Sequence, residues 1–329
     1  MRPFFSIGVT TYNRRELLKE TLASVLRQRF TDYEVLVGND FTQEPLSAQS
    51  LGVKDPRIQL LNHLENLGEL KNMNLLLAQS RGRYFTWLAD DDLYAPDFLL
   101  AAHSALVKFG FPPCAFTAYY SGKTFEPPVL GGEWPMDLYS GGEFLDLYLS
   151  RRLLAIGCYG VFERDYLSRT GGMEPLGNSF SPYSDNLLAI RAGLLDRVTY
   201  VNAPLVFYRT HPGSVSYTSG DVGAFLSAQD DLFRKSLVIF RDVKLSDRFA
   251  VCLYYLLRWC MVDFSSAVRK GGGIGIRQAI AYARFAFTYI NLLRGSPHYW
   301  PGLALLGKTA LRIARDVAKA RVRQFRPGD

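Results

Sequence analysis

The chain has 329 residues, of which 48% are hydrophobic, 14% aromatic and 21% charged. This composition excludes a largely disordered protein, and the length suffices for one large α/β domain with additions or for two smaller domains. The formal net charge is +7, and residues 303–326 alone carry seven Lys and Arg against one Asp. Because the positive charge is confined to one terminal segment, we do not expect nucleic-acid binding.

Residues 4–110 alternate short β-rich runs with helical ones, which is typical of stacked βα units and a mainly parallel sheet. We expect a helix over residues 14–29 and strands over residues 4–10, 33–38, 57–61 and 83–89. Pro96 is expected in the first turn of the next helix. The predicted fold class is therefore α/β, with a mostly parallel doubly wound sheet.

The second half of the chain is less regular. Residues 121–142 contain eight Gly and Pro and predict a long loop, in which Trp134 either stacks on an acceptor sugar or anchors the loop. Strands are expected over residues 157–162 and 198–208, the latter broken by Pro204. Beyond residue 221, aromatic and basic helices are expected, with a break at three consecutive glycines, 271–273.

No feature of the sequence predicts export or a membrane span. The four cysteines have no metal-binding spacing and are interpreted as reduced, buried thiols. The chain begins with a strand-like run, which differs from a signal peptide. The most apolar stretch, residues 249–268, is interrupted by Arg258 and Asp263. We therefore expect a cytoplasmic protein.

Polar residues follow each of the four predicted strands. In an open parallel sheet these positions share one edge, outside the carboxyl ends of the strands, where ligands bind. They are Thr10, Thr11, Tyr12 and Asn13; Asn39 and Asp40; residues 62–68; and Asp90, Asp91 and Asp92. The sequence thus predicts one binding crevice.

The three adjacent aspartates are the strongest chemical signal. Three carboxylates at a strand end repel one another unless a cation neutralises them. Mg²⁺ and Mn²⁺ prefer such oxygen ligands, and Mg²⁺ commonly combines one or two carboxylates with substrate phosphates. Asp90, Asp91 and Asp92 are therefore candidate metal ligands, the alternative being a solvated loop or a helix cap.

Four phrases, in this order, resemble the family 2 glycosyltransferases, whose nucleotide-sugar domain has the GT-A fold. The resemblance is close over residues 4–110 and looser over residues 156–216. The phrases are VTTYNR at 9–14, VLVGND at 35–40, ENLG at 65–68 with Asn74 and AQSRGRY at 78–84, and LADDD at 88–92.

This resemblance implies an inverting transfer of a sugar from a nucleotide-sugar, such as a UDP-sugar, to a hydroxyl of a saccharide or lipid-linked saccharide. It implies a GT-A domain over residues 1–220, with nucleotide-sugar binding in 1–110 and the acceptor and catalytic part in 111–220. Residues 221–329 would form a helical, basic C-terminal region.

The resemblance also implies roles for single residues. Thr10 and Asp40 would contact the base, Asp90 the ribose or diphosphate, and Asp91 would be the principal metal ligand. The remaining donor-binding candidates are Thr11, Tyr12, Asn13, Asn39, Asn66 and Asn74. Two positions depart from the family pattern: Ala89 stands where the first Asp of Asp-x-Asp is usual, and Asn39 replaces a more common Asp. Either Asp90-x-Asp92 serves as the motif in a shifted frame, or Asp91 works without the usual partner.

Two further candidates lie downstream. Asp185, in PYSDNL, resembles the family's catalytic base, although Ser184 stands where Glu is usual; its alternative role is the N-cap of a helix over residues 187–195. His211, in FYRTHPGS, resembles a histidine that completes the metal shell in some relatives, and it is otherwise an ordinary surface or core residue.

The basic C-terminal segment has two competing interpretations. Residues 302–309 match the written form of a phosphate-binding loop, but the Leu-Ala-Leu-Leu centre favours a helix and no strand precedes it. Residues 303–326 instead fit an amphipathic basic helix, which can lie on an anionic membrane surface, bind a partner or pack on the protein's own core. We expect peripheral membrane association.

Two alternative functions remain open. A sugar-nucleotide nucleotidyltransferase also uses a parallel sheet and acidic metal ligands, but it needs an N-terminal glycine-rich loop, which residues 9–15 lack. An inactive nucleotide-sugar-binding scaffold is compatible with the substitutions at Ala89, Asn39 and Ser184.

Overall fold

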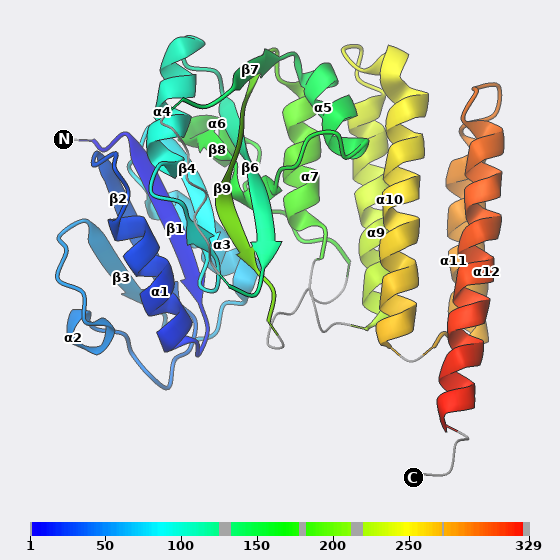
Figure 1. The fold of residues 1–329 in the computed structure, drawn as a ribbon, viewed down its shortest axis with the longest axis horizontal. Helices are drawn as coiled ribbons and strands as arrows, with labels where there is room; N and C mark the ends of the chain where they lie inside the picture. Colours follow the sequence, from blue (N-terminus) through cyan, green and yellow to red (C-terminus); the bar gives the residue numbers. More distant parts are fainter. Residues whose placement is uncertain (1, 125–132, 178–181, 212–219, 272, 325–329) are drawn as a thin grey trace. The chain divides into compact units, whose positions relative to one another are not determined.

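The structure is a computed structural model that describes residues 2–124, 133–177, 182–211, 220–271 and 273–324 (Figure 1). The chain forms two compact units. The first unit comprises Met1–Phe144, Leu153–Glu174 and Arg191–Thr210, and the second comprises Leu145–Arg152, Pro175–Ile190 and His211–Asp329. The second unit thus takes two short segments from the region before residue 211, whereas the functional division at residue 220 remains a prediction.

A nine-stranded sheet forms the centre of the first unit, with the strand order β3-β2-β1-β4-β8-β6-β9-β5 and with β7 paired to β9. Neighbours are parallel from β3 to β4 and between β6 and β9, whereas β8, β5 and β7 pair antiparallel. The bounds are β1 Phe5–Thr11, β2 Tyr33–Asn39, β3 Ile58–Asn62, β4 Tyr84–Ala89, β5 Leu93–Tyr94, β6 Cys114–Gly122, β7 Met136–Tyr139, β8 Val161–Glu163 and β9 Val198–Arg209. The prediction of a mostly parallel α/β sheet is confirmed.

Strands β1 and β2 are buried along their length, apart from Thr10 near the end of β1. In β1, Phe5, Ile7 and Val9 are fully buried, and in β2 Val35 and Val37 are as well. Residues that follow these strands are therefore fixed at the edge of a rigid sheet.

The helices of the first unit follow the strands, as the βα pattern predicts. Their bounds are α1 Arg15–Leu26, α2 Ala48–Leu51, α3 Glu69–Gln79, α4 Phe98–Lys108 and α6 Arg164–Arg169, while α5 Gly141–Leu149 and α7 Ser184–Arg191 continue from one unit into the other. Helix α3 approaches β2 closely: a Cβ on Gly38 would lie 2.0 Å from Asn72 Oδ1, and Asn72 Nδ2 donates to the Gly38 carbonyl oxygen at 2.9 Å. This contact positions α3 beside the end of β2.

Several expected boundaries are wrong in detail. Helix α4 begins at Phe98, so Pro96 precedes the helix. Residues 157–159 form a 3₁₀ turn before the short strand β8, and β9 continues through Pro204, opposite an irregularity in β6. Proline is tolerated there because the ladder is already shifted.

The long loop expected over residues 121–142 is shorter. Strand β6 extends to Gly122, β7 covers Met136–Tyr139 and α5 begins at Gly141, while residues 125–132 lie outside the described part. Trp134 packs against the hydrophobic core of the first unit. This burial favours a loop anchor over an acceptor-stacking residue.

Most of the second unit consists of long helices, which lie side by side in Figure 1. Their bounds are α9 Val222–Phe240, α10 Phe249–Lys270, α11 Ile276–Asn291 and α12 Tyr299–Gln324. The Phe264 ring of α10 stacks on the Tyr282 ring of α11 with 3.7 Å between centroids. Residues 302–309 lie within α12, which confirms that they form a helix instead of a phosphate-binding loop.

Helix α10 belongs to a segment, Ser246–Lys270, that is long and apolar enough to cross a membrane by length and composition alone. Over half of its most apolar stretch, 56%, is buried inside the structure. Its inward side includes Leu253, Leu256 and Phe264, all fully buried. This burial is what a core helix shows.

Asp263 makes the burial of α10 testable. Burial raises the pKa of this carboxyl to about 6, although Arg151 and Lys270 act in the opposite direction. The folded-state pKa is thus above the unfolded value of about 3.9, so the stabilising contribution is complete below about pH 4 and is lost as the pH rises through about 6.

We therefore expect Asp263→Asn to gain stability relative to the wild type as the pH rises from about 4 to about 7, by about 3 kcal/mol at most. Urea unfolding of both proteins across this range measures the difference. Asp247→Asn, at a side chain that is 76% exposed, is the control. A difference that does not change with pH would contradict the burial of Asp263.

Candidate functional site

The loop after β4 is held on α1 and on the end of β1. Thr11 Oγ1 donates to Asp90 Oδ2 at 2.6 Å, and Thr21 Oγ1 lies 2.9 Å from the carbonyl oxygens of both Asp90 and Asp92. Only 4%, 9% and 1% of Asp90, Asp91 and Asp92 are exposed. These aspartates therefore do not lie on a solvated loop, which was the alternative interpretation.

Arg14 lies between two of the carboxylates. One nitrogen of its guanidinium, Nη1, is 3.2 Å from Asp90 Oδ1 and 3.0 Å from Asp91 Oδ2. Burial raises the pKa of Asp90 above its usual range, and the charge of Asp91 adds to this, whereas the hydrogen bond from Thr11 opposes it. The site thus holds concentrated negative charge, which Arg14 compensates.

Glu69 adds a carboxylate that the sequence analysis missed. It is the first residue of α3. Although much of Glu69 is exposed, the surrounding protein desolvates its carboxyl group and raises its pKa, and Asp91 and then Asp90 raise it further. The only signal in the sequence was its position directly after Gly68, in the polar segment that follows the third predicted strand.

Asp92 serves a different purpose from its two neighbours. Its Oδ2 accepts a short hydrogen bond from the Tyr159 hydroxyl, and its Oδ1 accepts one from the Arg209 backbone N–H at 2.8 Å. Burial raises the pKa of Asp92 to about 8. Through these two bonds Asp92 has a structural role, because it ties the end of β9 to the end of β4. Its role as a metal ligand remains a prediction.

The remaining carboxylates fit a partial metal site. In the described part of the chain, no three His, Cys, Asp or Glu side chains converge closely enough to hold a metal ion. Arg14 Nη1 contacts both Asp90 Oδ1 and Asp91 Oδ2, so these two carboxylates lie close together. This arrangement fits an ion that takes one or two carboxylates from the protein and its other ligands from substrate phosphates and water.

Asp40 lies at the same edge, after β2. Its backbone N–H donates to the Thr11 carbonyl oxygen at 3.0 Å, and its Oδ1 accepts from the Leu67 N–H at 2.9 Å. The residue is 4% exposed. Asp40 therefore connects the loops after β1 and β3 and has a second carboxylate oxygen, Oδ2.

Three predicted donor contacts support the loops themselves. The Asn39 amide bonds to Asn62 and to the backbone of Phe41 and Glu44. Asn66 Oδ1 accepts from the Gly68 N–H, and the Asn74 amide bonds both ways to the Met173 backbone. These amides hold the loops in place, and their role as direct donor contacts remains a prediction.

The loop after β1 presents the other predicted residues to solvent. Thr10 is half-buried, Tyr12 is 52% exposed and rests edge-on against Phe41, and Asn13 has a left-handed backbone with φ of 53°. The short polar side chain of asparagine tolerates this conformation. Tyr12 and Asn13 remain available to a ligand.

Asp185 and His211 belong to the second unit, so their roles remain predictions. Helix α7 begins at Ser184 and ends at Arg191, instead of covering residues 187–195. Asp185 therefore lies inside the first turn, where a carboxylate interacts favourably with the helix dipole, and the N-cap interpretation is wrong.

The contacts of Arg14 lead to a prediction about how the negative charge of Asp90 and Asp91 is compensated. We expect Arg14→Gln to lower stability in EDTA by about 1–3 kcal/mol, because Asp90 and Asp91 lose a charge-assisted hydrogen-bond donor. Mn²⁺ should then raise the melting temperature more in the variant than in the wild type, since a second cation replaces the lost charge. Thermal unfolding with EDTA and with Mn²⁺ measures both effects.

Arg27→Gln, at an exposed arginine of the same helix region, is the matched control. An equal response of wild type and Arg14→Gln to Mn²⁺ would contradict a shared site for the two cations.

The comparisons with known proteins bear on this geometry. The family model for glycosyl transferase family 2 matches residues 6–169, which include β1 to β4 and the aspartates after them. This chain belongs to glycosyl transferase family 2. Membership confirms the resemblance stated from the four sequence phrases.

Two curated relatives are similar to parts of the N-terminal half. A putative colanic acid biosynthesis glycosyl transferase, WcaA, of Escherichia coli is 34% identical over 33% of this chain and 41% of its own length. The GalNAc(5)-diNAcBac-PP-undecaprenol beta-1,3-glucosyltransferase of Campylobacter jejuni is 36% identical over 32% of this chain and 34% of its own length. The similarity thus spans less than half of either relative.

Solved structures resemble this family 2 chain over nearly its whole length. Residues 1–349 of Staphylococcus aureus TarS, in complex with UDP, superpose with a TM-score of 0.67 at 14% identity, covering 99% of this chain and 93% of that one. The mannosyltransferase PcManGT of Pyrobaculum calidifontis, in complex with GDP-Man and Mn²⁺, gives 0.52 at 17% identity, covering 97% and 88%. These likenesses confirm the GT-A type of fold.

Proposed function

We propose that this protein transfers a sugar from a nucleotide-sugar, most simply a UDP-sugar, to a hydroxyl of a saccharide or lipid-linked saccharide, with inversion at the anomeric carbon. The observation that carries this proposal is the convergence of Asp40, Asp90 and Asp91 at one edge of a family 2 sheet. The UDP bound to TarS supports the choice of donor, and the name of the Campylobacter relative supports a lipid-linked acceptor.

Asp40 and the loop after β1 would bind the nucleoside. The Asp40 carboxylate has one oxygen committed to the Leu67 N–H, and we propose that Oδ2 accepts the imide N–H of uracil. Thr10, which pairs with Gly38 across β1 and β2, would line the base pocket. Thr11 would act indirectly, because its hydroxyl is bonded to Asp90.

Asp91, assisted by Asp90, would hold Mn²⁺ or Mg²⁺. When bound, the ion supplies positive charge that stabilises the departing nucleoside diphosphate. Asp92 would hold Arg209, the last residue of β9, next to these carboxylates. His211, two residues farther along the chain, is a further candidate ligand.

Asp185 would be the catalytic base that accepts the proton of the acceptor hydroxyl. In a single in-line displacement the hydroxyl attacks the anomeric carbon from the side opposite the leaving group, which produces inversion, and Asp185 would take the proton that this hydroxyl loses. Its place in the first turn of α7 fixes the backbone from which the carboxylate extends.

We propose that three parts of the chain have the roles that the sequence suggests. Residues 1–110 would bind the donor, residues 111–220 would bind the acceptor and supply the base, and residues 221–329 would bring the protein to the cytoplasmic face of a membrane. Peripheral attachment would place the enzyme near lipid-linked acceptors.

Donor hydrolysis tests the proposal without knowledge of the acceptor. We expect the full chain to release UDP slowly from one or more UDP-sugars, with Mn²⁺ and not with EDTA. The second candidate is an inactive donor-binding scaffold, which Ala89 favours because it replaces the first carboxylate of Asp-x-Asp. A scaffold would bind UDP without releasing it from any UDP-sugar, and that result would replace the proposed function.

A further inference from the structure

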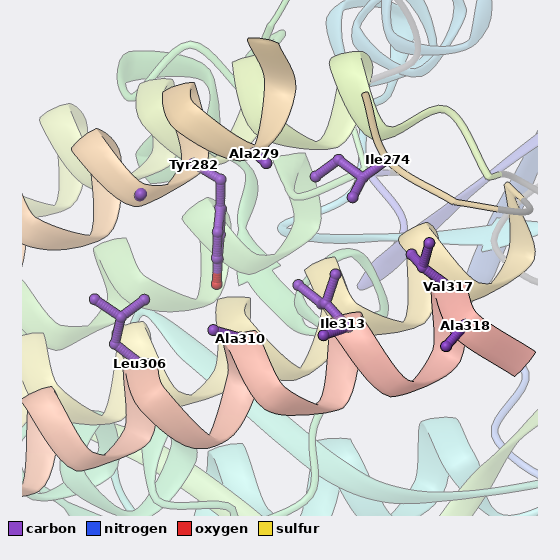
Figure 2. A pocket seen from close by; sticks show the side chains of 10 residues that line it. Ile274, Ala279, Tyr282, Leu306, Ala310, Ile313, Val317 and Ala318 are labelled. Carbon is purple, nitrogen blue, oxygen red and sulfur yellow. The ribbon is translucent and has the colours of Figure 1, made fainter. Parts of the chain in front are cut away.

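The α11–α12 hairpin contains an apolar groove of about 640 Å³ that has no part in the site above. Figure 2 shows its lining side chains, which come from both helices. Leu306, Ala310, Ile313 and Val317 line it from α12, and Ala279 and Tyr282 line it from α11. Leu306 and Val317 are eleven positions apart, so at about 1.5 Å per residue the groove extends along about 16 Å of helix.

Tyr282 gives the groove one polar group. The residue is only 5% exposed, and its hydroxyl has no hydrogen-bond partner among the described residues. Figure 2 shows the ring pointing from α11 toward α12. An unpaired buried hydroxyl is costly, so this position favours a ligand that carries a hydrogen-bond acceptor.

The surface of α12 beside the groove is ordered by helical periodicity, at about 100° per residue. Ala310 faces the groove, and rotations about the axis of α12 are measured from it. Trp300 and Leu311 lie at about 80–100°, and three basic residues lie farther round the helix, at about 140–200°. Trp300 and Leu311 are each 74% exposed. The three exposed basic residues are Lys308, Arg312 and Arg315.

Helix α11 repeats this order. Counted from Tyr282, three exposed apolar residues come at about 120–160°, and Arg277 and Arg284 follow at about 200–220°. The apolar residues are Ile276, Ile280 and Phe287, which are 79%, 49% and 49% exposed. At one end of the groove Ile274 lies near Val317, and at the other end Tyr282 lies near Leu306. The two helices therefore run antiparallel. The exposed apolar stripes therefore share one side of the groove.

Charge identifies the partner of this surface. Residues 273–318 contain six Lys and Arg and a single acidic residue, Asp316. Apolar stripes rimmed by basic residues match the interface of an anionic bilayer, in which apolar side chains enter the acyl boundary and basic ones contact phosphates. A polar or acidic protein partner would leave the apolar stripes and the groove uncovered.

We propose that the α11–α12 hairpin docks on an anionic phospholipid leaflet and that the groove takes one acyl chain of a phospholipid, whose ester carbonyl accepts a hydrogen bond from Tyr282. This inference deepens the membrane attachment proposed above and does not depend on the catalytic residues. It extends the contact from the basic helix alone to both helices and a lipid site.

Vesicle binding tests the docking surface. The full chain is sedimented with vesicles of phosphatidylcholine alone and with vesicles that also contain phosphatidylglycerol. We expect binding only to the anionic vesicles, weakened by salt. Each removed basic residue should lower affinity about fivefold, so Lys308→Gln with Arg312→Gln should lower it by about a factor of 25. Equal binding to both vesicles, or no binding, would overturn the proposal.

The groove is tested by filling it. Ala314→Phe places an apolar ring among the lining residues, and Ala304→Phe, at an exposed alanine of α12 outside the lining set, is the matched control. Native mass spectrometry with short-chain phosphatidylglycerol should show one bound lipid on wild type and on Ala304→Phe, and none on Ala314→Phe. Tyr282→Phe should lower the occupancy. Unchanged occupancy in Ala314→Phe would overturn the lipid site.

Two further readouts separate the possible failures. If the wild type is a dimer that Ala314→Phe converts to a monomer, the groove is a self-association surface and the proposal is wrong. UDP-sugar hydrolysis by Ala314→Phe should equal that of the wild type, because no residue of the catalytic site is changed. Loss of lipid binding with retained hydrolysis therefore supports the groove, and absence of hydrolysis in all proteins contradicts the proposed function alone.

Discussion

Asp91→Asn is expected to lower sugar transfer by about a thousandfold or more. The substitution keeps the volume of the side chain and removes the charge that would hold the cation. A metal ion at a leaving group contributes several kcal/mol of transition-state stabilisation, and each 1.36 kcal/mol corresponds to a factor of ten in rate. The effect should appear equally in UDP-sugar hydrolysis, which requires the same departure of UDP.

Asp97→Asn is the matched control for this experiment. Asp97 is also an aspartate in the region after β4, but it pairs with Arg29 at 2.6 Å at the start of α4. We expect it to affect stability and to leave the rate within a few-fold. Asp91→Asn with wild-type turnover in Mn²⁺ would show that the cation, if needed, binds elsewhere.

Asp185→Asn is expected to lower transfer to an acceptor by about 10²–10⁴-fold, the usual contribution of a general base. Donor binding should be unchanged, because the residue would contact the acceptor hydroxyl. The expected signature is therefore a loss of kcat with an unchanged UDP-induced thermal shift. UDP-sugar hydrolysis by water, which is a smaller nucleophile in the same position, should fall as well.

Asp221→Asn separates catalysis from helix stability. Asp221 caps α9, where its side chain accepts from the Ala224 N–H at 3.0 Å. If Asp185 served only its helix, both substitutions would cost a little stability and neither would affect transfer. An active Asp185→Asn protein would contradict the assignment of the base.

The sequence was most informative where one physical rule decides the outcome. The four polar clusters converge because parallel strands present their carboxyl ends at one edge, and the pairings Thr11 with Asn39 and Thr10 with Ala89 bear this out. Helix α12 was also predictable, since an apolar run without a preceding strand cannot form a phosphate-binding loop.

Side-chain partners were harder to predict because they depend on distant parts of the chain. Nothing near Asp92 in the sequence indicates that Tyr159 and Arg209 occupy its two oxygens, 67 and 117 residues away. The charge of Arg14 was visible in VTTYNR, but its position between Asp90 and Asp91 requires the β1–β4 pairing. Long-range hydrogen bonds of this kind turn a run of three aspartates into one structural and two candidate functional residues.

The α11–α12 groove could not be predicted from the sequence, because it also depends on contacts between distant parts of the chain. Leu306, Ile313 and Val317 predict one apolar face of α12, but the partner face of α11 and the unpaired Tyr282 hydroxyl appear only when the helices pack. Amphipathic periodicity identifies a face without identifying what covers it.

We propose that Asp40, Asp90 and Asp91 form a metal-dependent site for a uridine nucleotide. A thermal-shift series with UDP, GDP, CDP and ADP, each with Mn²⁺ or EDTA, measures this directly, because a ligand that binds the native state raises the apparent stability. We predict the largest shift for UDP with Mn²⁺, its loss in EDTA and its loss in Asp91→Asn. Equal shifts with all four nucleotides, or a UDP shift that persists in EDTA, would contradict the account.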